Sequence, residues 1–174
     1  AFQDGATLED LARLFVDQHE TRELYAETQG NTAFATMVYQ NVLGRSPDDA
    51  GLKFWVGVLD TGAVSRDQFI LEVLRGAKAA PAAEAGPEFI NQQRLDRAHL
   101  DSKVDLGALY AVHFGLTNVR KATDALDLYD GTAAGMEAAI TAIEEYHIAA
   151  LDPDDGEFMM PLTGVLPQPF ADMA

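Results

Sequence analysis

The stretch FATMVYQNVLGRSPDDAGLKFW, residues 34–55, contains the end of one predicted helix, a tight corner and the start of a second predicted helix. Apolar side chains recur at helical spacing up to Gly44, which stands where helices commonly end in a left-handed residue. Ser46 is a predicted N-cap, Pro47 suits a first helical turn, and the two aspartates that follow favour the positive end of the helix dipole. The stretch therefore predicts a helix–turn–helix corner.

Helix start and stop signals of the same kind occur on both sides of this corner. Thr7 with Asp10, and Ser65 with Gln68, have the spacing of capping boxes. Further predicted N-caps are Asn31, Asn118 and Thr132, and further predicted helix ends are Gly62, Gly115 and Gly131. No stretch alternates apolar and polar residues as a half-buried strand does. We therefore expect an all-α fold, a helical bundle of about seven helices.

The second half of the chain is predicted to open with one long helix, or two abutting helices, over residues 88–114. The predicted core residues of this segment are Val104, Ala108, Tyr110, Ala111 and Phe114. Small residues and two prolines dominate residues 76–87, which favours a connection there. One arrangement of the bundle is thus two helical subdomains packed on each other. The predicted segments are a module at 1–78, a connection at 79–87, a second subdomain at 88–150 and an irregular acidic, proline-containing tail at 151–174.

Composition and charge limit the classes of function. The chain has 174 residues, 48% of them hydrophobic, and no apolar run approaches the roughly 20 residues that a membrane-spanning helix needs. It has no cysteine, which excludes disulfides, thiolate metal ligands and a cysteine nucleophile. The formal charge of −16 repels nucleic acids and anionic lipids and attracts cations such as calcium. We therefore expect neither nucleic-acid binding nor membrane insertion.

The corner also carries a family signature. It contains Tyr39, Asn41-Val42-Leu43-Gly44-Arg45, Pro47-Asp48, Gly51-Leu52 and Phe54-Trp55. This series resembles the signature of the domain-of-unknown-function family 4214, in which an aromatic residue, Asn-Val-Leu-Gly-Arg, Pro-Asp, Gly-Leu and an aromatic-Trp pair follow one another. With its helical flanks, the resemblance covers about residues 8–78.

The resemblance implies a helical module of secreted bacterial proteins, in the RTX-type calcium-binding, adhesin and S-layer classes. It implies an extracellular or cell-surface location, and it implies no reaction and no catalytic residues. The sequence opens at Ala1 and not at Met, as a piece of a longer protein would, so the lack of a visible signal peptide says little about export.

Known capping and packing chemistry accounts for the residues of this motif. We expect Gly44 to adopt a positive φ, Asp48 to pair with Arg45 or to accept backbone N–H groups, Gly51 to let another helix approach and Trp55 to anchor the core. The full predicted structural motif is Asn41, Gly44, Arg45, Pro47, Asp48, Gly51, Leu52 and Trp55. A structural role is therefore favoured over a ligand site.

The best metal candidate follows the last predicted helix. Residues 152–157, DPDDGE, place carboxylates around a glycine turn as the start of a calcium loop does, so Asp152, Asp154, Asp155 and Glu157 are the predicted ligands. The twelfth position from Asp152, where an EF-hand has a bidentate acid, is Thr163. A solvated acidic turn is therefore the simpler interpretation, and the predicted cofactor is either none or calcium.

No catalytic motif stands out in the sequence. The four histidines lack the spacing of a zinc site, and there is no nucleophile elbow or phosphate-binding glycine loop. We therefore expect a non-enzymatic accessory or interaction module of a secreted or cell-surface protein, serving adhesion, surface assembly or secretion support. Its protein or glycan partner and its oligomeric state stay open. The alternatives are a glycan-active or hydrolytic enzyme with acids in a cleft between the two halves, and a purely structural spacer.

Overall fold

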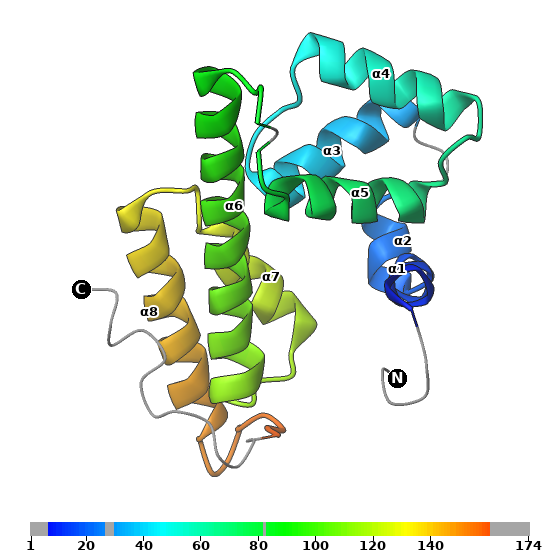
Figure 1. The fold of residues 1–174 in the computed structure, drawn as a ribbon. Coiled ribbons are helices and arrows are strands. Elements are labelled where there is room, and N and C mark those ends of the chain that lie inside the picture. Colours follow the sequence, from blue (N-terminus) through cyan, green and yellow to red (C-terminus); the bar gives the residue numbers. More distant parts are fainter. Residues whose placement is uncertain (1–6, 27–29, 82, 161–174) are drawn as a thin grey trace. The chain divides into compact units, whose positions relative to one another are not determined.

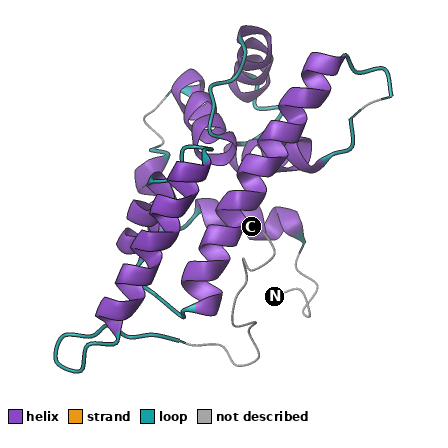
Figure 2. Ribbon diagram, turned by 90° about the vertical axis from the view of Figure 1, so that its left-hand side faces the viewer, coloured by secondary structure: helices purple, strands orange, loops and turns teal. Residues whose placement is uncertain are grey.

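The computed structural model describes residues 7–26, 30–81 and 83–160 (Figure 1). Within these ranges the chain forms eight α-helices and one π-helical segment, and no strand (Figure 2). The predicted all-α fold class is therefore confirmed. The β-type pairing in this part of the chain is limited to an isolated antiparallel bridge between Leu116 and Met159. No helix in the described ranges is both long enough and apolar enough to cross a membrane.

The chain divides into two compact units, residues 1–97 and 98–174. The first unit contains α1 (Leu8–Val16), α2 (His19–Leu24), α3 (Asn31–Leu43), α4 (Asp49–Asp60), α5 (Arg66–Lys78) and the first part of α6 (Pro87–Ala108). The second unit contains the rest of α6, the π-helical segment η2 (Leu109–His113), α7 (Val119–Asp127) and α8 (Ala133–Ala150). The division thus falls within α6, and the chain between α5 and α6 spans residues 79–86, while Pro87 already belongs to α6.

Helices α3, α4 and α5 of the first unit lie together (Figure 1), and aromatic side chains form the core between them. Phe69 of α5 is completely buried, and its ring centroid lies 5.6 Å from that of Phe34, 5.0 Å from that of Trp55 and 6.4 Å from that of Tyr39. Aromatic rings at such separations attract one another beyond the effect of the area they bury. Trp55 is half-buried, and its edge contact with Phe69 joins α4 to α5.

Local capping interactions set most helix ends. The Thr7–Asp10 capping box is formed, and all four predicted end glycines have a positive φ, as +68° at Gly44 shows. Asn118 and Thr132 also cap their helices as predicted. These ends form because each cap satisfies backbone groups that the helix itself leaves without a partner.

Two predicted N-caps are wrong by one or two residues. Gly30 and not Asn31 occupies the N-cap position of α3, and the Asn31 oxygen that a cap would use accepts instead from Nη2 of Arg66 at 3.2 Å. Asp48 and not Ser46 caps α4, since the Asp48 carboxylate accepts the N–H of residue 51 at 2.9 Å. The corner is therefore longer than predicted, and Pro47 precedes the N-cap instead of lying in the first helical turn.

The second unit buries one apolar cluster formed by the end of α6, η2, α7 and α8. Its largest completely buried side chains are Leu106 and Ile143, and half-buried residues such as Leu126 and Tyr146 pack against it. The last described residues cover the loop after η2, where the N–H of Met160 donates to the carbonyl of Gly115 at 2.7 Å. The remainder of the predicted tail, residues 161–174, lies outside the described residues.

The predicted core face of the long helix is partly wrong. Tyr110 is buried, but Val104 is 54% exposed, and Ala108 and Ala111 are exposed as well. The buried face instead runs through Leu106 and its neighbours in η2. The π-helical segment has a wider turn than an α-helix, so it changes which side chains face the core after residue 108, which accounts for Ala111 but not for Val104 and Ala108.

Candidate functional site

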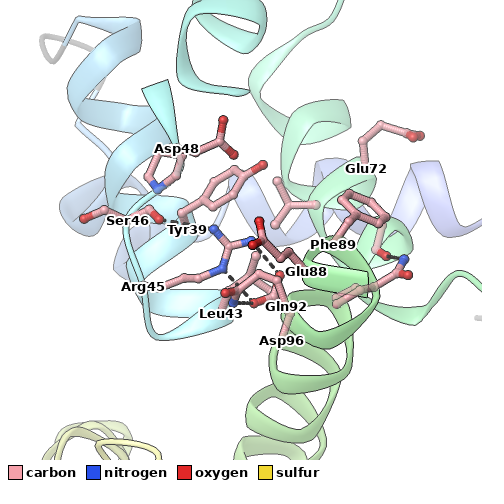
Figure 3. Close-up of a pocket in the computed structure, with 15 residues that line it drawn as sticks. Tyr39, Leu43, Arg45, Ser46, Asp48, Glu72, Glu88, Phe89, Gln92 and Asp96 are labelled. Atoms are coloured by element: carbon pink, nitrogen blue, oxygen red, sulfur yellow. Dashed lines mark hydrogen bonds and ion pairs between the residues drawn. The ribbon is translucent and has the colours of Figure 1, made fainter. Parts of the chain in front are cut away.

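A groove of about 560 Å³ lies within the first unit, beside the helix–turn–helix corner (Figure 3). Its lining comes from the end of α3 and the corner, from the second half of α5 and from the first turns of α6. Pockets that bind small ligands have volumes of roughly 300–1,000 Å³ and mostly apolar walls. The apolar walls here include Leu43, Val73 and Ala77, which are buried, and Phe89, which is 58% exposed.

The arginine of the corner is held by an aspartate from α6. Nε and Nη2 of Arg45 donate to the two carboxylate oxygens of Asp96 at 2.7 and 2.6 Å, and the Gln92 amide donates to Asp96 at 2.8 Å (Figure 3). The hydrogen bond with Asp96 raises the pKa of Arg45. Asp96 is only 6% exposed and is the one buried charged residue in the described ranges. A buried carboxylate requires such pairing, so this bidentate ion pair braces α6 against the corner.

Two more polar side chains tie the first part of α6 to the end of α5. The Gln93 amide donates to the carbonyl of Gly76 at 2.8 Å. Nη2 of Arg97 donates to the carbonyls of Lys78 and Ala79 at 2.9 and 2.7 Å. The last carbonyls of a helix have no partner within the helix, so these donors cap the end of α5. The first part of α6 therefore belongs structurally to the same unit as the corner.

Residues 12–80 match the family model described as Domain of unknown function (DUF4214). This match confirms the resemblance that the corner shows, over a segment that is less than half of the chain. The family description assigns no activity. No curated protein and no solved structure matches the chain. The DUF4214 segment ends before α6, so Asp96, the partner of its arginine, lies outside the matched residues.

The other motif residues of the DUF4214 segment make contacts within the fold. The Asn41 amide donates to the hydroxyl of Tyr25 at 3.0 Å, and burial raises the pKa of that tyrosine. A Cβ atom at Gly51 would lie 3.1 Å from the Asp48 carboxylate, so the missing side chain makes room for the N-cap and not, as predicted, for another helix. Leu52 is half-buried on α4.

Of the two roles predicted for Asp48, the structure shows the second: it accepts a backbone N–H group and does not pair with Arg45. Arg45 is already engaged by Asp96, while Asp48 caps α4. Three residues of the motif, Arg45, Pro47 and Asp48, line the groove. The DUF4214 corner thus both builds the fold of the first unit and supplies one wall of its groove.

The structure does not gather the predicted calcium ligands into one site. Asp152 accepts the N–H groups of Asp154 and Asp155 at 2.8 and 3.1 Å, and these hydrogen bonds lower the pKa of Asp152. Glu157 forms an ion pair with Lys121 at 2.9 Å. No cluster of three or more histidine or acidic side chains in the described ranges is placed to hold a metal ion. Calcium binding by this chain stays a prediction.

The sequence did not indicate the α6 wall of the groove. Phe89, Gln92 and Asp96 lie in the segment that was predicted to open a second subdomain, and no local pattern links them to the corner. The DUF4214 arginine itself is a general signal, because the guanidinium fork matches a carboxylate, but it does not name the partner. Three of the four histidines, His99, His113 and His147, lie against aromatic rings, as His147 does on Phe114 with centroids 4.3 Å apart, while His19 is exposed beside Glu23.

Proposed function

We propose that this chain is a non-catalytic interaction module whose binding surface is the groove beside the DUF4214 corner. The observation that supports this most directly is the combination of a braced wall with an open apolar lining. The Arg45–Asp96 ion pair holds two sides of the groove together, so little order has to be created when a ligand binds. Preorganised, concave, mostly apolar surfaces are typical of binding sites.

An exposed aromatic side chain at the groove adds to the argument. Phe89 is 58% exposed although it lies beside the buried Val73 and Ala77 in the groove lining. Binding energy in protein interfaces is concentrated in a few residues, which are often aromatic and become fully desolvated on binding. A partner that covers Phe89 would bury apolar surface that water now contacts.

The chemistry of the lining favours binding over catalysis. The residues that line the groove include no histidine and no lysine. The most buried of its acids, Asp96, accepts three hydrogen bonds from Arg45 and Gln92, and an acid held in this way is poorly suited to move a proton. The enzyme hypothesis therefore draws no support from this groove.

We further propose that the module works in an extracellular or cell-surface protein, in adhesion, surface assembly or secretion support. The support is the family resemblance of the corner together with the acidic charge of −16.

The binding function is tested by selecting ligands from a library of random twelve-residue peptides, with one variant that fills the groove and one that does not. Gly76 lines the groove, and a Cβ atom built there meets no atom within 4 Å. Gly57, on α4, is equally open and lies outside the lining. Both glycines are in helices, so Gly76→Leu and Gly57→Leu should fold at least as well as the natural chain.

Selected peptides should bind the natural chain and the Gly57→Leu variant with the same Kd. Binding to Gly76→Leu should be weaker by about tenfold or more, a loss of about 1.4 kcal/mol, because the leucine occupies the groove. Peptides that bind all three proteins equally would place binding elsewhere, and a library that yields no peptide would contradict the proposal.

A further inference from the structure

The charge of the groove is negative, and its one cation is already in use. Four acidic side chains and one arginine line the groove, which gives a formal charge of −3. Nε and Nη2 of Arg45 donate to Asp96, and Nη1 donates to the carbonyl of Ser46 at 3.2 Å. An anionic ligand would therefore meet the carboxylates of Asp48, Glu72 and Glu88. Glu72 is paired with Arg75 at 2.7 Å and Asp48 caps α4, so the exposed Glu88 is the acid best placed to meet a ligand.

One polar atom of the groove lining, the side-chain oxygen of Gln93, is an acceptor without a hydrogen bond in the described residues. This oxygen is buried, while the other end of the same amide is bound to Gly76. Glu88 is exposed at the start of α6. Buried acceptors without a partner are costly, so a ligand that supplies donors gains more here than one that supplies acceptors.

Aromatic and aliphatic surface lies next to these carboxylates. The rings of Tyr39 and Phe89 and the side chains of Leu43 and Val73 contribute to the lining. The face of an aromatic ring attracts a cation, and the Arg45 guanidinium already lies 5.4 Å from the centroid of the Tyr39 ring. Lysine and arginine can place their aliphatic stems on apolar surface while the charged end reaches a carboxylate.

From this combination we infer that the groove binds a cationic, amphipathic peptide segment. A lysine or arginine of the ligand meets Glu88 and its acidic neighbours, and adjacent apolar residues meet Val73 and Phe89. The inference rests on the proposed binding function and specifies the chemical class of its ligand. A second copy of this chain is a poor occupant, because two chains with a charge of −16 each repel one another and no free cation of the groove offsets this.

The test uses the same peptide library, selected on the natural chain and counter-selected against the Gly76→Leu variant. That variant has the same net charge, so peptides held by general attraction to an acidic surface are removed. The enriched peptides should contain lysine or arginine next to apolar residues. The most enriched peptide should bind about fivefold or more weakly to a Glu88→Lys variant and when its own basic residues are replaced by glutamine.

A matched control is Glu137→Lys, which makes the same charge change at an exposed position of α8 and should leave the Kd unchanged. Enriched peptides that are neutral or acidic but still depend on Gly76 would overturn the cationic ligand while keeping the binding function. Peptides that ignore Gly76→Leu would remove both proposals. Self-association in sedimentation experiments that Gly76→Leu abolishes would identify a second copy as the occupant and would likewise overturn the inference.

Discussion

Replacing Arg45 with alanine leaves the Asp96 carboxylate buried without its cation. The Asp96 side chain is 8% exposed, and of its three hydrogen bonds only the one from Gln92 remains in the variant. Breaking a buried ion pair from one side costs roughly 3–5 kcal/mol. The Arg45 side chain is 29% exposed, so water partly solvates the pair, and we expect a loss near the lower end, about 3 kcal/mol.

The reverse substitution should cost less. Asp96→Ala leaves a guanidinium that is 29% exposed and can turn toward water, so we expect a loss of about 2 kcal/mol, the value of a charge-assisted hydrogen bond. The double variant Arg45→Ala with Asp96→Ala should be more stable than the sum of the single losses predicts, because it leaves no unpaired charge behind.

The assay is urea unfolding followed by tryptophan fluorescence. Trp55 is the single tryptophan and packs on Phe69, so its emission reports on the first unit. With a slope of roughly 1–3 kcal/mol per molar urea, a loss of about 3 kcal/mol lowers the midpoint by roughly 1–3 M. The control is Arg94→Ala on α6, whose guanidinium makes an exposed hydrogen bond to Asn91 and should change stability by less than about 0.5 kcal/mol.

Two results would refute this reasoning. If Arg45→Ala behaves like Arg94→Ala, the ion pair is solvated and does not brace the groove. If Asp96→Ala costs more than Arg45→Ala, the buried carboxylate is not the group that needs its partner. The Kd of a groove-binding peptide for the Arg45→Ala variant gives an independent measure, because a loose α6 should weaken binding.

Four further outcomes follow from the structure. Asp48→Ala should lower stability by about 1 kcal/mol while Asp48→Asn should lose almost none, since asparagine also caps helices; both are read from urea midpoints. Leu106→Ala should cost roughly 2–5 kcal/mol in thermal unfolding followed by circular dichroism, because this side chain is completely buried. Hydrogen bonds lower the pKa of Asp130 and Asp152. The stability that these carboxylates contribute is therefore present above the unfolded pKa of about 3.9 and is lost as pH falls through the folded pKa. Urea midpoints measured over a series of acidic pH values should show this loss, and the loss should be smaller in the Asp152→Asn variant. With calcium at about 100 times the Kd of a specific site, binding would add roughly 2.7 kcal/mol to the stability and raise Tm by several degrees, and magnesium would not. The double variant Asp152→Ala with Asp154→Ala should remove this effect. Equal responses of Tm to both ions would contradict the calcium prediction.

The parts of the fold that could be predicted depend on interactions within a few residues. The Thr7–Asp10 capping box and the positive φ of Gly44 involve neighbours three or four positions apart, so their residue types alone are informative. The N-cap of α4 was missed because three polar candidates within four residues, Ser46, Asp48 and Asp49, compete, and the corner geometry selects Asp48. The core face of the long helix was predicted only in part. A π-helical segment changes the register after residue 108, which accounts for the exposed Ala111, whereas Val104 and Ala108 lie exposed on the α-helical part before it.

The candidate site likewise has features that the sequence predicts and features that it does not. The sequence by itself determined that the chain is helical, that it carries the DUF4214 corner between two capped helices, and that its charge is strongly negative. Only the tertiary structure decided that Arg45 pairs with Asp96, 51 positions away, and that Phe89 and Gln93 complete the groove. Periodicity and capping depend on residues a few positions apart, so the residue types in a short stretch predict them. A buried ion pair and a groove form where segments distant in the sequence pack together, and no residue spacing in the chain predicts which segments do so.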